Sequence, residues 1–359
     1  MEVIDILRKL ISFNTIEDKE NKEIIEWIEK YLQEIGFTCT KIIDETTQKG
    51  CLIAEKGENP QLAFCGHLDT VNATEKWKRN PLELTIEDDK IYGLGVCDMK
   101  GGISAFLKAC SNINKEKLKN GVKLFFTYDE EINFEGINLL LKNKVKFPKL
   151  LILAEPTDLK PVTATKGCIE MKVTFYGKSS HSSMPDKGKS AIIEAHKFIG
   201  ELLEFYEELK KETNEIFSIP YTTMNIGKIN GGDAINKVPD ECCIEFDART
   251  IAKEHNKIIV EKVKSILEKY EAKLEIGIDI KSNINTNEKM IKEIEKMTQC
   301  KAQSENYVTE ASFIPESESI ILGVGPVTAH QCDEHIEIEK LEKLVKIYDN
   351  ILQNYEMFL

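Results

Sequence analysis

"LAFCGHLD", residues 62–69, is an apolar stretch that ends in a histidine and an aspartate. Its apolar residues are continuous rather than alternating, a pattern typical of a strand covered on both faces of a sheet. His67 and Asp69 stand where such a strand would end. Alternate residues of a strand point to the same face, so these two side chains can lie side by side. Taken alone, they are either metal ligands or polar residues that merely finish a strand.

Four more apolar runs of this kind lie along the chain: CLIAE (51–55), KLFFTY (123–128), LLILA (150–154) and IILGV (320–324). Apolar residues also recur at helical spacing in residues 3–11, 21–35 and 101–110, and in a C-terminal helix with Leu344, Ile347 and Ile351. Covered strands interspersed with helices predict an α/β domain, in which a sheet is flanked by helices.

The pattern changes between residues 168 and 281. CIEMKVTFYG (168–177) alternates as a half-exposed strand does. It is followed by a long amphipathic helix from Ser190, two strands, a second helix near 255–270 and a last strand, AKLEIGIDI (272–280). This β-α-β-β-α-β order is the ferredoxin-like arrangement, and 359 residues are enough for two domains. We predict an α/β domain formed by residues 1–167 and 282–359, with an inserted ferredoxin-like α+β domain, residues 168–281.

The composition excludes several classes of function. The formal net charge is -13 at pH 7, whereas a nucleic-acid-binding surface needs a basic footprint. No apolar run approaches the length that spans a membrane, and the N-terminus lacks a signal core. The ten cysteines form no C-x-x-C pair, which argues against a disulfide framework and against cysteine-ligated zinc. We therefore expect a cytoplasmic protein that binds neither nucleic acid nor membranes.

Acids and histidines follow most of the predicted strands of the α/β domain. Besides His67 and Asp69, they are Asp129, Glu130, Glu131, Glu155 and His330, and Asp98 precedes a helix. Each has a plain structural reading; Asp98, for example, could cap the helix at 101–110. The adjacent Glu130 and Glu131, however, would repel each other in a cleft unless cations neutralised them. Two divalent ions bridged by one carboxylate would remove that repulsion.

Seven motifs, in chain order, resemble the co-catalytic metallohydrolases, a family that includes aminoacylases, succinyl-diaminopimelate desuccinylase and carboxypeptidase G. They are GHLDTV (66–71), Trp77 with Pro81, DDKIYGLGVCDMKGG (88–102), TYDEE (127–131), AEPTD (154–158), SSHSSMP (179–185) and AHQCDEH (329–335). The resemblance covers essentially the whole chain. It implies a catalytic α/β domain and an inserted domain that acts as lid and dimerisation domain.

The resemblance also implies roles for individual residues. Five of them would hold two zinc ions, for which cobalt or manganese could substitute: His67 and Glu155 on one ion, Glu131 and His330 on the other, and Asp98 on both. Glu130 would be the general base, and Asp69 would hold the ring of His67, because a ligating histidine generally donates its other N–H to such a partner.

Three residues of the inserted domain complete the implied site. His181 would reach the active site of the partner subunit in a homodimer formed through this domain, where its ring would stabilise the oxyanion. Asn236 and Arg249 match positions that line the substrate pocket. Arg249 has a surface salt bridge as its plain reading, but a fork on a substrate carboxylate is favoured by the resemblance and by Asn236 nearby.

Within the family, further stretches resemble the members that hydrolyse N2-acetyl-L-ornithine to L-ornithine and acetate in arginine biosynthesis. These are residues 155–167, 219–243 and 306–313. A metal-bridged water, activated by Glu130, would attack the amide of this small N-acyl amino acid. Glu310, in the last stretch, could pair with the δ-ammonium of ornithine or could only order a loop.

Two other functions stay open. The same chemistry could act on another N-acyl amino acid, a dipeptide or succinyl-diaminopimelate, and a panel of substrates would separate these. A non-catalytic relative could use the same pocket only for binding; stoichiometric metal without hydrolysis of any acyl amino acid would favour it.

Overall fold

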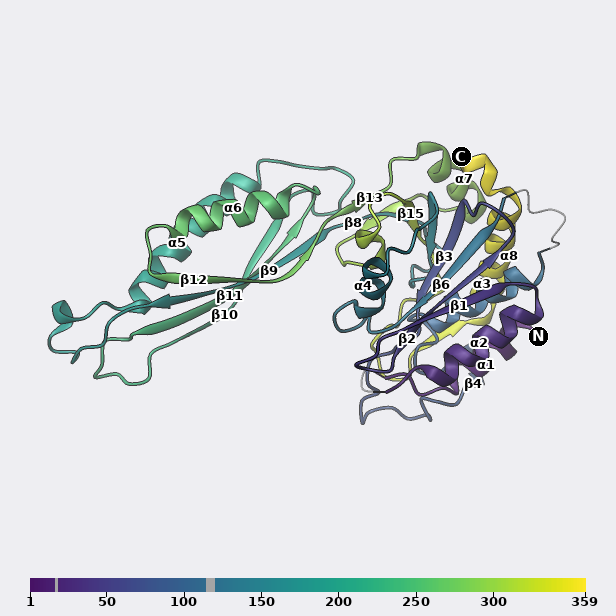
Figure 1. The fold of residues 1–359 in the computed structure, drawn as a ribbon, viewed down its shortest axis with the longest axis horizontal. Helices are drawn as coiled ribbons and strands as arrows, with labels where there is room; N and C mark the ends of the chain where they lie inside the picture. The colour runs from purple at the N-terminus through teal and green to yellow at the C-terminus, as the bar shows by residue number, and fades with distance from the viewer. Residues whose placement is uncertain (17–18, 114–119) are drawn as a thin grey trace. The chain divides into compact units, whose positions relative to one another are not determined.

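The computed structural model describes residues 1–16, 19–113 and 120–359 (Figure 1). The chain forms two compact units. The first contains Met1–Thr163, Ile284–Gln303 and Ile314–Leu359, and the second contains Ala164–Asn283 and Ser304–Phe313. The second unit thus consists of one long continuous stretch and of a short segment, Ser304–Phe313, that comes later in the chain.

Within the described residues, a nine-stranded sheet runs through the first unit. Its spatial order is β1 (Thr38–Ile43), β2 (Gly50–Lys56), β6 (Val122–Thr127), β3 (Leu62–His67), β7 (Leu150–Leu153), β15 (Glu318–Ile321), β8 (Val162–Thr165) and β13 (Asn283–Ile284), with β14 (Gln303–Glu305) paired to β8. The five apolar runs of the sequence are β2, β3, β6, β7 and β15, and they are buried as predicted, apart from a few side chains at the strand ends.

Four neighbouring strands of this sheet, β6, β3, β7 and β15, run parallel. His67 pairs with Thr127 across β3 and β6, and Cys65 pairs with Leu153 across β3 and β7. The carboxyl ends of these strands therefore meet at one edge of the sheet, the edge at which such folds bind ligands.

One apolar core joins the sheet to the helices α1 (Val3–Ile11), α2 (Lys22–Glu34), α3 (Lys100–Ser111), α7 (Glu288–Thr298) and α8 (Ile338–Asn354). Alternate strand residues such as Phe64 and Leu124 enter it, and Phe64 packs against Phe106 of α3 and Tyr348 of α8. A further helix is α4 (Glu135–Lys142), and a small second sheet joins β4 (Thr85–Glu87), β5 (Lys90–Tyr92) and β16 (His335–Glu337). The predicted α/β arrangement is confirmed.

The second unit has a four-stranded antiparallel sheet in the order β10 (Thr223–Gly231), β11 (Glu241–Thr250), β9 (Gly167–Tyr176) and β12 (Ala272–Ile280). The helices α5 (Ala191–Leu209) and α6 (His255–Leu267) connect these strands in the chain order β9-α5-β10-β11-α6-β12. This confirms the predicted ferredoxin-like arrangement.

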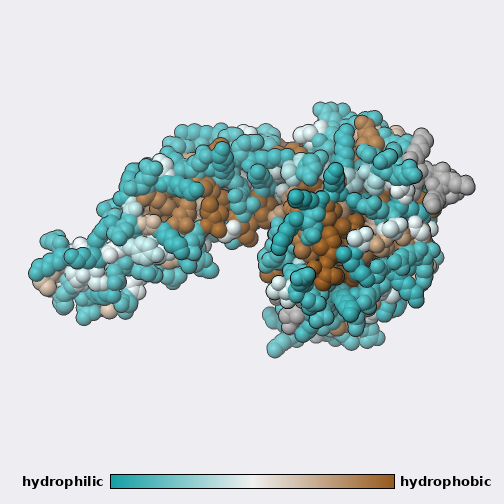
Figure 2. Space-filling model, viewed as in Figure 1, coloured by the Kyte–Doolittle hydropathy of each residue, from teal (hydrophilic) through white to brown (hydrophobic). Residues whose placement is uncertain are grey.

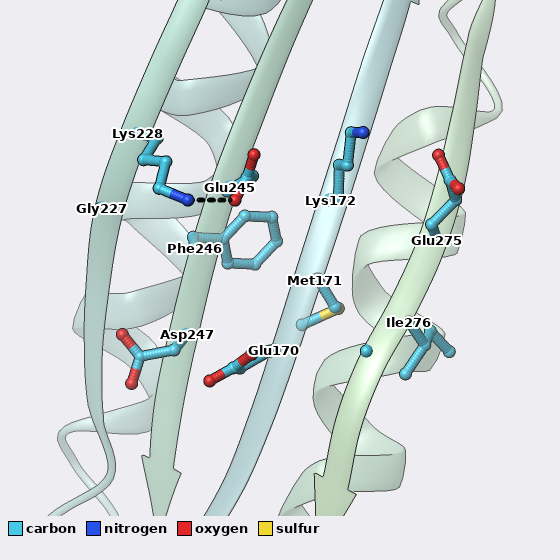
Figure 3. Close-up of a pocket in the computed structure, with 11 residues that line it drawn as sticks. Glu170, Met171, Lys172, Gly227, Lys228, Glu245, Phe246, Asp247, Glu275 and Ile276 are labelled. Atoms are coloured by element: carbon cyan, nitrogen blue, oxygen red, sulfur yellow. Dashed lines mark hydrogen bonds and ion pairs between the residues drawn. The ribbon is translucent and has the colours of Figure 1, made fainter. Parts of the chain in front are cut away.

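The two faces of this second sheet differ. Every second residue of β11, from Cys242 to Thr250, is buried, and several of these pack with α5 and α6 in one apolar cluster. The other face carries charged side chains around a shallow groove of about 500 Å³, where the Nζ of Lys228 lies 3.0 Å from the carboxylate of Glu245 (Figure 3).

Most of the visible surface of the protein is hydrophilic, with scattered apolar patches (Figure 2).

None of the helices in the described part of the chain combines the length and the apolarity that crossing a membrane requires.

Candidate metal centre

Six acidic or histidine side chains come together at the carboxyl edge of the parallel strands. His67 is the last residue of β3, Glu130 and Glu131 follow β6, Glu155 follows β7, His330 lies in the loop after β15, and Asp98 precedes α3. Parallel strands are the reason for this convergence, because loops that leave the same edge can aim side chains at one point.

Asp98 lies at the centre of this cluster. Its Oδ1 is 3.1 Å from Nε2 of His67, and its Oδ2 is 3.5 Å from Nε2 of His330. The capping role considered above for Asp98 is excluded, because the N-cap of α3 is Met99, with no side-chain capping bond. Asp98 therefore presents one carboxylate oxygen to each of two histidines.

Asp69 connects two members of the cluster. The Nδ1 of His67 lies 3.1 Å from the main-chain oxygen of Asp69 and 3.5 Å from its carboxylate. The other carboxylate oxygen accepts the main-chain N–H of Glu131 at 3.1 Å. Asp69 thus orients the ring of His67 and also holds the backbone that carries Glu131.

Two groups of ligand atoms can be distinguished in the cluster. His67, Asp98 and Glu131 offer atoms that all lie within 4.8 Å of one another, and so do His67, Glu130 and Glu155. The Nε2 of His330 is 2.9 Å from Oε1 of Glu131. His67 is fully buried, whereas the side chain of His330 is 53% exposed, so the centre has one closed end and one open end.

The electrostatics of the cluster show an excess of negative charge. Burial raises the pKa of Glu155 well above its usual value, and the charge of Asp98 raises it further. Burial by itself would lower the pKa of His67, but the carboxylates of Asp69, Asp98 and Glu155 raise it well above normal. A hydrogen bond to Glu131 raises the pKa of His330 despite partial burial. The surrounding carboxylates thus favour the protonated, cationic forms of His67 and His330, whereas burial favours the neutral form of Glu155.

This donor set fits divalent cations. Imidazole nitrogens and carboxylate oxygens are among the ligands that zinc, cobalt and manganese take in proteins. The two oxygens of Asp98 are already directed to different histidines, and cation binding would compete with protonation of the ligands.

The turn that carries Glu130 and Glu131 is anchored by a buried ion pair. The Nζ of Lys49 lies 2.5 Å from Oδ1 of Asp129, and both side chains are about 10% exposed. Asp129 adopts a left-handed backbone conformation, with φ 54°, and its carbonyl accepts the N–H groups of Asn133 and Phe134. Lys49 was not recognised from the sequence, because it lies 80 residues from Asp129 in a polar segment.

Glu334 and Lys100 are two more buried charged residues that sequence reasoning missed. Burial raises the pKa of Glu334 to about 7, although three main-chain N–H groups oppose this. Burial lowers the pKa of Lys100 to about 7, while the charges of Glu334 and Asp69 act in the opposite direction. Both residues stand inside the motifs quoted above, Lys100 two residues after Asp98 and Glu334 four after His330, and this proximity was the available signal.

In the second unit, His181 and Asn236 lie in adjacent loops. The backbones of His181 and Lys237 form an isolated antiparallel β-bridge. The N–H of Ser182 donates to the carbonyl of Asn236 at 3.0 Å. Both residues are exposed. The Nδ1 of His181 accepts the N–H of Ser183 at 3.2 Å, so its Nε2 is directed away from this turn.

Arg249 is not beside Asn236, and the expectation that the two residues are close within one chain is wrong. Arg249 stands near the end of β11, paired with Cys168, whereas Asn236 precedes the start of that strand. The eight residue steps from Glu241 to Arg249 span roughly 26 Å of extended chain. The Nε of Arg249 donates to Asp247 at 3.0 Å. Glu310 begins the short helix η3 (Glu310–Phe313) of the second unit and is buried.

Comparison with known proteins agrees with this centre. Residues 63–354 match the model of peptidase family M20/M25/M40. The chain is 34% identical to an acetylornithine deacetylase of Photorhabdus laumondii, and the match covers 98% of this chain and 97% of that protein. It is 32% identical to an acetylornithine deacetylase of Proteus mirabilis, and that match covers 98% of this chain and 96% of the relative.

Solved structures share the fold. A tripeptidase of Staphylococcus aureus superposes with a TM-score of 0.78 at 22% identity, over 98% of this chain and 97% of that one. A Bacillus subtilis protein described as a dinuclear metal-binding peptidase of the M20 family superposes with a TM-score of 0.71 at 15% identity, over 98% and 96%. The chain therefore belongs to peptidase family M20/M25/M40 and is a metal-dependent amide hydrolase.

Proposed function

We propose that the protein hydrolyses N2-acetyl-L-ornithine to L-ornithine and acetate, a step of arginine biosynthesis, in the cytoplasm. Full-length similarity to proteins named acetylornithine deacetylase supports this substrate. The observation that carries the chemistry is the carboxylate of Asp98, whose two oxygens face two different histidines. Ten free thiols accord with a reducing compartment.

In this proposal the cluster holds two zinc ions, with cobalt or manganese as substitutes. His67 and Glu155 would hold one ion, Glu131 and His330 would hold the other, and Asp98 would contribute to both. When bound, such ions polarise the amide carbonyl and make water a stronger acid. Metal ligands must be deprotonated, so binding of the ions would compete with protonation of His67, Glu155 and His330, whose pKa values are raised in the metal-free chain.

Glu130 is the proposed general base. Its carboxylate lies in one group with His67 and Glu155, next to the ligands but outside the pairs assigned to the two ions. In that position it can accept a proton from the attacking water and pass it to the leaving amine. Asp69 is a positioning residue, since it holds the His67 ring through its carbonyl and the Glu131 backbone through its carboxylate.

Arg249 and Glu310 are the proposed substrate contacts. Arg249 would bind the α-carboxylate of the substrate, because a guanidinium matches that group with two parallel hydrogen bonds. Glu310 would pair with the δ-ammonium. It is buried and acidic, and a buried acid favours a cationic partner over a neutral one.

The substrate proposal is tested by metal analysis combined with a panel of acyl amino acids. The unmodified enzyme is expected to prefer N2-acetyl-L-ornithine over N-acetyl-L-methionine, and Glu310→Gln is expected to lose activity chiefly on acetylornithine. Values of kcat/KM for both substrates and both enzymes measure this preference. Equal losses on the two substrates would remove the role of Glu310, and a preference for a neutral acyl amino acid, a dipeptide or succinyl-diaminopimelate would defeat the ornithine proposal.

We also propose a homodimer formed through the second unit, in which His181 enters the site of the partner. Exposed apolar side chains support such an interface: Ile193 and Leu203 on α5 are 55% and 47% exposed, and Ile229 on the edge strand β10 is 54% exposed. An edge strand is a template for pairing with another chain. Since Asn236 lies beside His181, the same subunit would present both.

Mixed dimers test this arrangement. His181→Ala and Glu130→Gln are each expected to be inactive as pure dimers. In a mixed dimer one site combines an intact Glu130 from one subunit with an intact His181 from the other, so random co-assembly restores about a quarter of full activity. Co-expression with two affinity tags, followed by assay and sedimentation analysis, measures this. A fully active monomer, or mixed dimers without activity, would contradict the shared site.

A further inference from the structure

We propose that Glu334 is a positioning residue that fixes Asp98 relative to His330 by clamping the backbone of the Asp98 loop. This inference rests on the metal roles proposed above and goes beyond them, because Glu334 is not a ligand. It is 2% exposed and stands four residues after His330.

The carboxylate of Glu334 accepts three main-chain N–H groups from the loop that ends in Asp98. Gly95 donates to Oε2 at 2.8 Å, and Cys97 and Asp98 donate to Oε1 at 2.7 Å and 3.0 Å. A carboxylate is an acceptor on both oxygens, so it can satisfy all three donors at once. The last of these donors is the backbone of the bridging residue itself.

The backbone around Glu334 joins the same two loops. Its carbonyl accepts the N–H of Gly93 at 3.2 Å, and the next residue, His335, pairs with Tyr92 in the β16–β5 ladder. On the other side, Thr328 exchanges hydrogen bonds of 2.6 Å and 2.9 Å with His335, which closes the loop that carries His330. Glu334 is thus the point at which the Asp98 loop is held against the His330 loop.

The distance that this clamp controls is the one between the two ligands. Asp98 Oδ2 and His330 Nε2 lie 3.5 Å apart, although the residues are far apart in the chain and His330 is half exposed. Nothing in the local sequence fixes that separation. Mutation of residues that hold metal ligands in position through hydrogen bonds typically lowers metal affinity about 10–100-fold.

The test is a metal titration of Glu334→Gln. The amide keeps the size of the side chain but replaces one acceptor oxygen with an N–H donor, which would face the donor N–H of Gly95 or those of Cys97 and Asp98. We expect the affinity for Zn²⁺ and Co²⁺, measured against a chromophoric chelator, to fall about 10–100-fold. The absorption spectrum of the Co²⁺-loaded protein should also change, because the ligand geometry changes.

Asn285→Ala is the matched control. Asn285 is a buried polar side chain of the same unit that accepts the N–H of Asn287 at 2.8 Å and donates to Ser319 at 2.8 Å. Ser319 lies toward the start of β15, the end of the sheet opposite the centre. This variant should lose stability yet keep the metal affinity and the Co²⁺ spectrum of the unmodified protein.

If Glu334→Gln does not fold, Glu334→Asp replaces it in the same titration. The shorter acid keeps the charge but cannot reach all three donors, so an intermediate loss of affinity is expected. Metal affinity and spectrum identical to those of the unmodified protein, in whichever variant folds, would overturn the role of Glu334. Failure of the unmodified protein itself to bind metal would instead overturn the proposed function, so the two failures can be told apart.

Discussion

Replacing Glu130 with glutamine is expected to lower kcat by about 10²–10⁴-fold while the protein keeps its full complement of metal. Glutamine preserves the size of the side chain but cannot accept a proton from water. The other residues of the cluster, including the 2.9 Å contact between Glu131 and His330, are left in place. The measurements are kcat on an acetylated amino acid and metal ions per chain by elemental analysis.

Glu131→Gln is the matched control for this experiment, because it changes the neighbouring residue in the same way. Glu131 faces His330 and belongs to the ligand group around Asp98, so this variant should lose metal affinity first and activity as a consequence. The reverse pattern, with metal lost from the Glu130 variant and retained in the Glu131 variant, would mean that base and ligand are exchanged.

Replacing Lys49 with methionine is expected to lower the free energy of unfolding of the first unit by about 3–5 kcal/mol, because it leaves the buried Asp129 charge without its cation. The two side chains are 2.5 Å apart and each is about 10% exposed. Both tryptophans of the chain, Trp27 and Trp77, lie in the first unit. Urea unfolding of metal-free protein followed by their fluorescence therefore reports on that unit alone.

A double-mutant cycle isolates the pair. Lys49→Met combined with Asp129→Leu removes both charges and should recover most of the lost stability, since a buried ion pair can often be replaced by apolar residues at little cost. If the losses in the free energy of unfolding of the two single variants simply add in the double variant, Lys49 acts through other contacts. Because Asp129 precedes Glu130 directly, the single variant should also impair turnover.

Much of the fold could be predicted because it depends on local periodicity. Continuous apolar runs predicted the buried strands β2, β3, β6, β7 and β15, and the change to alternation after residue 168 predicted the half-covered sheet of the second unit. A side chain's burial follows from the strand or helix period of its own segment, so a short window of sequence carries that information. The polar residues at the strand ends were recognisable for the same reason.

Contacts between distant segments could not be read in this way. The expected closeness of Asn236 and Arg249 was wrong, since both belong to the second unit but lie at opposite ends of β11. The capping role considered for Asp98 was excluded by the structure, in which Met99 is the N-cap of α3 and no side chain caps this helix. Lys49 and Glu334 were not recognised from the sequence, because the burial of a charged side chain depends on which other segments surround it.

The sequence by itself determined which segments are strands and helices, and which strand ends carry acids and histidines. Tertiary structure alone decided that Asp98 stands between two histidines, that Lys49 secures the turn before Glu130, and that Glu334 holds the Asp98 loop. The physical reason is that periodic burial is a property of neighbours along the chain. A ligand geometry accurate to fractions of an ångström is instead set by hydrogen bonds and ion pairs between residues that only folding brings together.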